Sequence, residues 1–194
     1  SHKRETPSPV LQLAFAFRIV LRTFIRTKTA ILQRHYVKKE FTVTTWELLK
    51  PYFDELEQRN IRTPEELENW LRDYSELSAV VSENMAWRYI KMTCDTANTE
   101  LRDSFNDFVQ NIEPHMAPVA NELNKKIIES PHAGALTKNG YNIYLRSIRN
   151  SVELFREENI PLNTQLQELE QQFGAINGEQ SIEHDGEKMT LQKA

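Results

Sequence analysis

Apolar residues recur every three or four positions along most of the chain, which is the spacing of an amphipathic helix. The clearest run consists of Leu67, Leu71, Tyr74, Leu77, Val81, Met85, Tyr89 and Met92. It follows Thr63-Pro64-Glu65-Glu66, which combines a helix N-cap, a proline at the first helical position and a glutamate able to reach back to the cap. We therefore predict one long amphipathic helix that begins after Thr63.

Two further helical elements lie on either side of this run. Phe41-Thr42-Val43 is predicted to be a short extended link, and Thr44 with Glu47 forms the pattern of a capping box for a helix that reaches about Arg59. Pro51 would lie within the first two turns of that helix. After a break at residues 95–98, helical spacing resumes at Leu101, Phe105, Phe108, Ile112, Leu123 and Ile127. Pro114 and Pro118 should kink or divide this element.

The C-terminal third is predicted to hold two more helices after a loop from Ser130 to Gly140. The first carries Tyr141, Tyr144, Leu145, Ile148, Val152 and Phe155 and ends before Pro161. The second carries Leu162, Leu166, Leu169 and Phe173, and we expect Gly174 to end it. Antiparallel neighbours are expected wherever the connecting loops are short.

The chain closes on a predicted β-hairpin. Ala175 to Glu183 and Glu187 to Leu191 flank His184-Asp185-Gly186, and Asp-Gly is a preferred pair in tight hairpin turns. Two strands alone are marginal in water, so this hairpin needs a surface to lie on. The predicted fold class is mainly α, an antiparallel helical bundle or lobe with a C-terminal β-hairpin. Three segments follow: an extension over 1–34, a helical lobe over 35–174 and a hairpin over 175–194.

The extension over residues 1–34 has a different character from the rest. Ser8-Pro9 predicts the start of a helix to about Gln33, in which Arg18, Arg22 and Arg26 form a basic stripe against Phe, Leu and Ile. Three interpretations stay open: a targeting peptide, a membrane-surface anchor, and a packed or cloning-derived helix with a solvated cationic face. The apolar stretch from Val10 to Leu21 is too short and too charged to cross a bilayer.

Charge separates the same two parts of the chain. Nine lysines and arginines and one glutamate precede Glu40, whereas the remainder has fifteen basic and twenty-seven acidic residues. An acidic body argues against nucleic acid as a partner, because binding there depends on neutralised phosphates. The single cysteine, Cys94, excludes an intrachain disulfide, is compatible with a cytoplasmic location, and is interpreted as a small buried apolar residue.

No catalytic motif is found in the sequence, so no catalytic or metal-binding residue is assigned, and substrate-binding residues are unknown. None of the five histidines is followed by glutamate and no two lie four apart, as a zincin helix requires. The acidic cluster of Glu183, His184, Asp185 and Glu187 favours a solvated turn over a metal site. Trp87-Arg88-Tyr89 and the run Tyr141 to Arg149 could clamp a ligand, but their helical spacing favours core and rim. The set of Glu153, Arg156, Glu157 and Glu158 is interpreted as an exposed, ion-paired face.

Six stretches, in order along the chain, carry a family resemblance. They are Trp46-Glu-Leu-Leu-Lys-Pro-Tyr-Phe, residues 66–77, Ala86-Trp-Arg-Tyr-Ile-Lys-Met-Thr-Cys-Asp-Thr, residues 123–126, residues 144–150 with 153–162, and residues 173–194. As a set, they resemble the N-terminal region of oligoendopeptidase F-type zinc metallopeptidases, which are relatives of thimet oligopeptidase. The resemblance covers about residues 35–194 and leaves out the first 34.

The resemblance implies a mainly helical, two-lobed hydrolase that cleaves short peptides in a deep channel. Its zinc would be held by His-Glu-x-x-His and a later glutamate, all downstream of Ala194, so this chain is expected to hold no cofactor itself. The expected partners are the C-terminal catalytic lobe and, in the whole enzyme, short peptides. Self-association through uncovered apolar faces is also expected. The alternative is a stand-alone helical module that binds a partner helix in an apolar groove.

Overall fold

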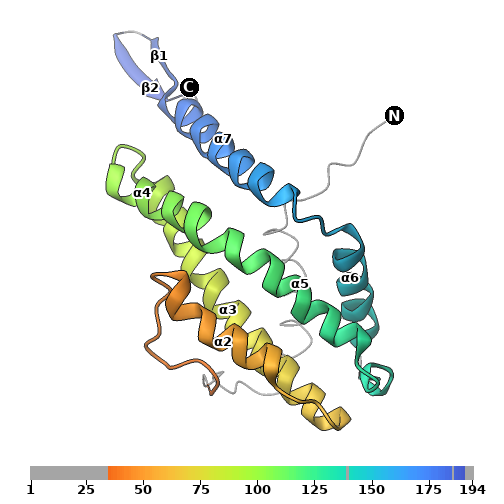
Figure 1. Cartoon of the computed structure of the whole chain (residues 1–194). Coiled ribbons are helices and arrows are strands. Elements are labelled where there is room, and N and C mark those ends of the chain that lie inside the picture. The colour runs from red at the N-terminus through yellow and green to blue at the C-terminus, as the bar shows by residue number, and fades with distance from the viewer. Residues whose placement is uncertain (1–34, 139, 185, 191–194) are drawn as a thin grey trace, which may run out of the picture.

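The computed structural model describes residues 35–138, 140–184 and 186–190, and within them the chain is mainly helical (Figure 1). The elements, in order, are α2 (Trp46–Gln58), α3 (Pro64–Cys94), α4 (Thr99–Asp107), a π-helical segment η1 (Phe108–Ile112), α5 (Glu113–Glu129), a 3-10 turn η2 (Ala133–Ala135), α6 (Tyr141–Leu154), α7 (Asn159–Glu179), β1 (Ser181–His184) and β2 (Glu187–Thr190). The helix predicted over residues 8–33 lies outside the described residues.

The predicted start of the long helix is confirmed. The side-chain oxygen of Thr63 accepts the backbone N–H of Glu66 at 3.1 Å, and Pro64 occupies the first helical position of α3. The Glu66 carboxylate reaches back one residue further than a capping box requires, because it accepts the N–H of Arg62 at 2.6 Å. Both ends of the motif therefore satisfy backbone donors that the helix itself leaves unpaired.

Helix α2 begins one residue later than the sequence pattern indicates. Its N-cap is Thr45, in extended conformation, so the capping box predicted from Thr44 and Glu47 is wrong. The Glu47 carboxylate instead accepts hydrogen bonds from its own backbone N–H and from the hydroxyl of Thr45, and these two bonds lower the pKa of Glu47. Pro51 lies within the helix in its second turn, where we expected it.

The element after the break at residues 95–98 is interrupted by a π-helical segment. Phe108–Ile112 form wider turns between α4 and α5, and the N–H of Glu113 donates to the carbonyl of Phe108, five residues earlier. Pro114 follows at once and has no N–H for the normal i to i−4 bond. The predicted division is confirmed before Pro114, in the form of an inserted wide turn, whereas α5 continues through Pro118 and is not divided there.

Helix α7 does not end at Gly174. It runs through Gly174 and Gly178 to Glu179, so the predicted stop is wrong and the first strand begins at Ser181 instead of Ala175. A glycine costs a helix interior only about 1 kcal/mol relative to alanine, which the flanking helix-forming residues can offset. The hairpin itself is confirmed: Ser181 pairs with Thr190 and His184 with Glu187, and Gly186 in the turn has φ 82°.

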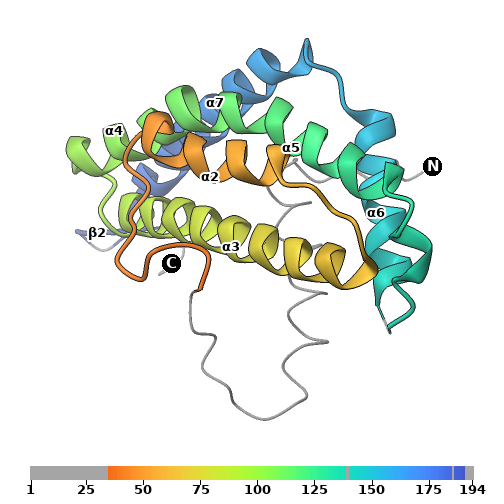
Figure 2. The same cartoon turned by 60° about the horizontal axis from the view of Figure 1, so that its bottom comes forward.

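The core lies between α2, α3, α5 and α6 (Figures 1 and 2). Its largest fully buried side chains are Trp70, Phe108, Leu49, Leu56, Leu67, Leu77, Ile112, Leu123 and Ile127. A smaller cluster of Met92, Phe105 and Val109 joins the C-terminal end of α3 to α4. Helix α7 contributes no buried residue to either cluster. In Figure 1 it runs along the α4–α5 side and carries the hairpin beyond the bundle.

Candidate interaction surfaces

Helix α7 presents its apolar side to solvent. Leu162, Leu166, Leu169, Phe173 and Ile176 recur at gaps of three or four and therefore form one stripe, which we call the α7 stripe. Every member is more than half exposed, from 51% for Leu166 to 68% for Phe173. The predicted helix is thus confirmed, and its apolar face lies outside the core.

The opposite, mainly polar side of α7 contacts the bundle. The side chains that are half-buried there are Ile160, Asn163, Thr164, Gln167, Glu168, Gln171 and Ala175. The Gln110 side chain in η1 donates to the Glu168 carboxylate at 2.7 Å, and Gln167 hydrogen-bonds the Glu113 side chain. A helix that packs through hydrogen bonds and leaves five large apolar side chains in water gains little from burial. We therefore identify the α7 stripe as the main candidate interaction surface.

Glu113 has the least favourable environment of the residues in this polar contact. Burial raises the pKa of its carboxyl, although the hydrogen bond from Gln167 opposes the shift. One of its carboxylate oxygens, Oε2, is buried without a hydrogen-bond partner. A buried polar atom without a partner costs free energy, so the contact of α7 with the start of α5 is imperfectly matched.

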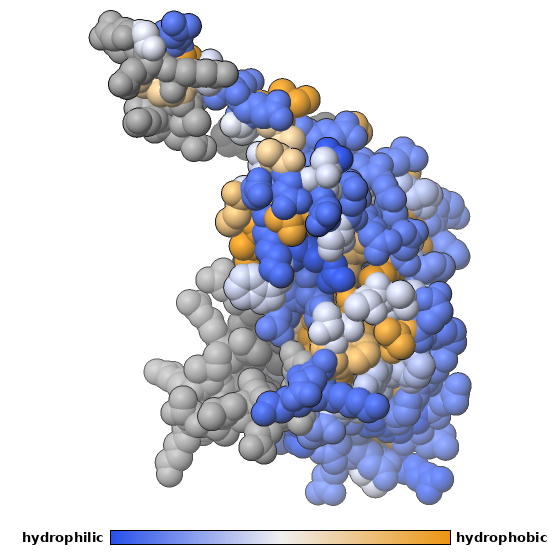
Figure 3. Space-filling view, turned by 90° about the vertical axis from the view of Figure 1, so that its left-hand side faces the viewer, coloured by the Kyte–Doolittle hydropathy of each residue, from blue (hydrophilic) through white to orange (hydrophobic). Residues whose placement is uncertain are grey.

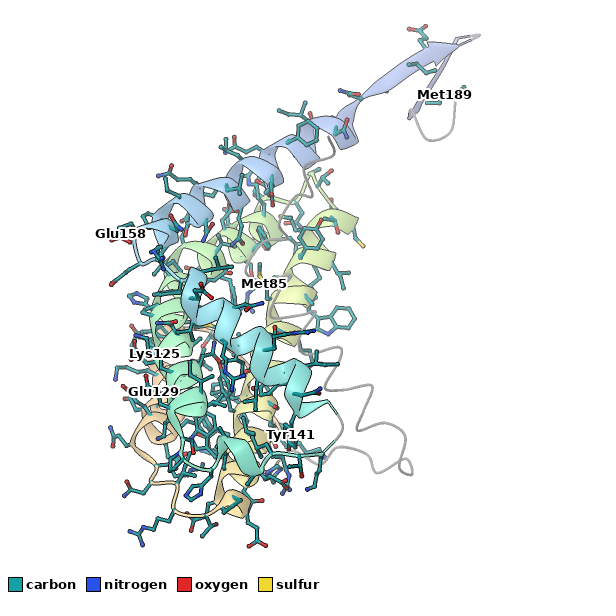
Figure 4. The ribbon with its side chains drawn as sticks, turned by 90° about the vertical axis from the view of Figure 1, so that its right-hand side faces the viewer. Met85, Lys125, Glu129, Tyr141, Glu158 and Met189 are labelled. Carbon is teal, nitrogen blue, oxygen red and sulfur yellow. The ribbon has the colours of Figure 1, made fainter. Side chains whose placement is uncertain are left out.

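The hairpin end of α7 stands clear of the bundle. Figure 4 shows Glu158 just before α7 and Met189 on the second strand of the hairpin, beyond the C-terminal end of α7. On the face shown in Figure 3, most exposed side chains of the bundle are hydrophilic, and the end of α7 with the hairpin projects above it. The hairpin, whose Ile182 is 38% exposed, thus has no sheet to extend among the described residues and depends on α7 for its position.

A second apolar surface lies on the C-terminal half of α3. Trp87 is 55% exposed, Ile90 is 43% exposed, and Cys94 is exposed at the end of the helix. We call these three residues the α3 stripe. The predictions that Cys94 is buried and that Trp87 and Tyr89 pack as core and rim are wrong. Trp87 and Cys94 lie on the side of α3 away from the buried Val81 and Met92. Tyr89 is likewise exposed and contacts only the edge of the smaller cluster, with its ring 5.8 Å from that of Phe105.

Arg88, between these aromatics, has a structural role. Its guanidinium donates to the carbonyl of Val43 at 2.7 Å and to that of Asn84 at 3.3 Å, and it lies over the Phe108 ring. Burial lowers the pKa of this guanidinium, which still remains charged. The Arg88 guanidinium thus ties the extended link to α3. The ligand clamp considered for Trp87-Arg88-Tyr89 therefore has no cation available to a ligand.

A carboxylate of α3 anchors the start of the described chain. The Glu76 carboxylate accepts the backbone N–H groups of His35, Tyr36 and Val37, at 3.1, 3.0 and 2.8 Å. The His35 ring lies between Glu76 and Asp73, 2.8 Å from each. These contacts hold His35 beside Asp73 and Glu76 of α3.

A lysine from α5 caps the C-terminal end of α2. Its ammonium donates to the carbonyls of Leu56, Glu57 and Arg59, at 2.9, 2.6 and 2.6 Å. This residue, Lys126, also lies 5.8 Å from the Trp70 ring centroid, and burial lowers its pKa. Neither Lys126 nor Glu76 carries a sequence signal, because their partners lie about 40 to 70 residues away in the chain.

The remaining charged and aromatic runs are structural. In the run from Tyr141 to Arg149, Leu145 and Ile148 are buried and Tyr144 packs against the core, so the expected core and rim are confirmed. Burial raises the pKa of Tyr144 far above its ordinary range. Arg156 donates to the carbonyls of Glu153 and Phe155, in place of the side-chain ion pairs that we predicted for this face.

Neither a metal cluster nor a membrane span occurs within the part of the chain that the structure describes. There, no three histidine, cysteine, aspartate or glutamate side chains come together as a metal ion would need. None of the described helices is long and apolar enough to span a bilayer.

The comparisons with known proteins give one match. A family model described as the Peptidase M3 N-terminal domain matches residues 37–155, which run from the anchored start of the chain to the end of α6. Neither the curated proteins nor the solved structures gave a match. The match covers the bundle and ends before the α7 stripe.

Proposed function

Because this chain belongs to the M3 peptidase family through its N-terminal domain, we propose that it is the non-catalytic lobe of a zinc oligopeptidase of the oligoendopeptidase F type. In this proposal the lobe encloses short peptides, and the catalytic chemistry is supplied by another part of the enzyme. The observation that carries it is the family match over residues 37–155. Peptidases of this family are generally zinc-dependent, and the described residues bring no metal ligands together.

The α7 stripe supports a specific form of this proposal. A row of five exposed apolar side chains on a helix with no lysine or arginine suits a large, permanent apolar contact better than a peptide substrate. We infer that the catalytic lobe covers this stripe and supports the hairpin. The helical bundle would then form one wall of the peptide channel.

The gene provides the first test. We expect the reading frame beyond the codon for Ala194 to encode His-Glu-x-x-His on a predicted helix, followed by a further glutamate ligand. A stop codon directly after Ala194 would refute the assignment. It would favour a second candidate, a helical module that binds an amphipathic partner helix along the α7 stripe.

Activity provides the second test. The whole enzyme should cleave a quenched fluorescent oligopeptide, and a chelator should abolish this cleavage, whereas the present chain alone should show none. Phe173→Asp in the whole enzyme should weaken the joint between the lobes and lower kcat/KM, while Gln172→Asp, on an adjacent polar position, should not. Chelator-sensitive cleavage by the present chain alone would contradict the proposal.

A further inference from the structure

The α3 stripe requires a partner of its own, and we propose that residues 9–33 dock on it as an amphipathic helix, covering Trp87, Ile90 and Cys94. The inference is independent of the proposed peptidase function, because it concerns the α3 stripe and not α7. Three observations carry it: where the chain enters the described structure, the match of the two apolar faces, and the distribution of charge.

The first observation is that residues 1–34 join the described chain on the side of α3 that carries the α3 stripe, about 16 Å before Trp87 along the helix. Glu76, which fixes residues 35–37, lies on the same line of the helix as Trp87, Ile90 and Cys94, which follow it by eleven, fourteen and eighteen residues. At 100° per residue these three lie within about 40° of Glu76 around the helix axis. The preceding segment therefore starts on the correct side of α3.

The polarity of the residues along this line of α3 determines the direction in which the docked segment would run. Toward the N-terminal end of α3 the line continues through Arg72, Asn69 and Glu65, which are polar and at least partly exposed. Toward the C-terminal end it passes the exposed Glu83 and then becomes the α3 stripe. An apolar helix face entering at the level of Glu76 can bury its surface only by running toward Cys94.

The second observation is that the segment has a matching face. On a helix over residues 9–33, the side opposite the arginine stripe carries Leu13, Phe17, Val20, Phe24 and Ile31. Such a helix would be about 37 Å long, and the distance along α3 from Glu76 to Cys94 is about 27 Å. The segment is thus long enough to cover the whole α3 stripe while Arg18, Arg22 and Arg26 remain in water.

The third observation concerns charge and tethering, and it favours the chain's own segment over other occupants. The segment is strongly basic and the rest of the chain strongly acidic, so docking within the chain is electrostatically favourable. A second copy would have to compete with a segment attached at His35, whose effective concentration is in the millimolar range. A membrane would attract the same basic segment and draw it away from the acidic body.

Cys94 is the only cysteine, so its reaction with a thiol reagent such as DTNB reports directly on the α3 stripe. We expect slow reaction in the full chain, because docking would cover the thiol. Phe17→Asp and Phe24→Asp should each raise the reaction rate about five-fold or more, because a docked state of four-fifths population protects by that factor. Phe15→Asp is the matched control: Phe15 lies on the arginine side, and this variant should react at the parent rate.

Companion measurements distinguish docking of residues 9–33 from unfolding, self-association and membrane binding. Circular dichroism should show that every variant keeps the helical content of the parent, and acrylamide quenching of Trp87, isolated by comparison with Trp87→Phe, should rise in the same variants. Equal thiol rates in all four chains would overturn the proposal. So would protection that grows with protein concentration, which indicates a second copy. Flotation of the parent with phosphatidylserine vesicles, together with a fast Cys94 reaction in their absence, would assign the segment to membranes instead.

Discussion

Helices α3 and α7 have the same kind of sequence and opposite positions in the fold. Both carry large apolar residues at gaps of three or four, yet α3 buries Leu67, Trp70 and Leu77 while the whole α7 stripe remains exposed. The two helices differ in the contacts that their polar sides make. The polar side of α3 faces solvent over its first half, whereas that of α7 is held by Gln110 and Glu113. Amphipathic spacing therefore identifies a helix and its two faces, but the neighbours decide which face is covered.

The largest expected effect comes from truncating the same residue type on each helix. Leu77→Ala should cost about 2–5 kcal/mol in the free energy of unfolding, because it opens a cavity at a fully buried site. Leu166→Ala on the α7 stripe should change it by less than about 0.5 kcal/mol in this chain. Urea denaturation followed by circular dichroism measures both. A cost above about 1.5 kcal/mol for Leu166→Ala would show that α7 is covered, and sedimentation would then test whether a second copy covers it.

An intermediate effect is expected at the cap on α2. Lys126→Met keeps the aliphatic stem against Trp70 but removes the donor to three carbonyls, so it should cost about 1–3 kcal/mol. Lys125→Met, next in sequence, breaks only an exposed pair with Glu122 and should cost about 0.5 kcal/mol or less. The same denaturation experiment applies. Equal effects of the two substitutions would contradict the role given to the Lys126 ammonium.

The smallest effect concerns the contact of α7 with Glu113 at the start of α5, and it depends on pH. The pKa of Glu113 is raised in the folded chain, so the stability linked to its protonation is fully present below its unfolded pKa and is lost as pH rises through the folded value. Glu113→Gln removes the charge and should stabilise the chain by about 1 kcal/mol at pH 7. The gain should vanish below about pH 4, near the ordinary pKa of a glutamate.

Thermal unfolding across this pH range checks the last expectation, with the exposed Glu122→Gln on the same helix as control. No difference between Glu113→Gln and the parent at pH 7 would mean that water satisfies the Glu113 carboxylate.

The sequence predicted those features that rest on local chemistry. Thr63-Pro64 fixed the start of α3, the Asp-Gly pair the hairpin, and Pro114 the interruption before α5. The errors arose where two local signals were nearly equal, as at Thr44 and Thr45, or where a weak signal was outweighed, as at Gly174.

The candidate surfaces needed the three-dimensional arrangement. The exposure of the α7 stripe follows from hydrogen bonds made by the other face of the helix, and no pattern within α7 records them. The anchoring of residues 35–37 depends on one glutamate about forty positions further along, and the cap on α2 on a lysine nearly seventy positions away. Contacts at such separations leave no periodic trace in a single sequence.

The wide turn at residues 108–112 sets the rotational phase between two halves of one continuous rod. Before it, Phe105 packs in the smaller cluster; after it, Leu123 and Ile127 pack in the main core. Winding the same five residues as an ordinary α-helix would rotate everything downstream by about 100°, the angle of the one extra residue that the wide turn takes up. Residues now directed inward would then point to the side. The wide winding of that short segment, more than the identity of its residues, holds the two halves in alignment.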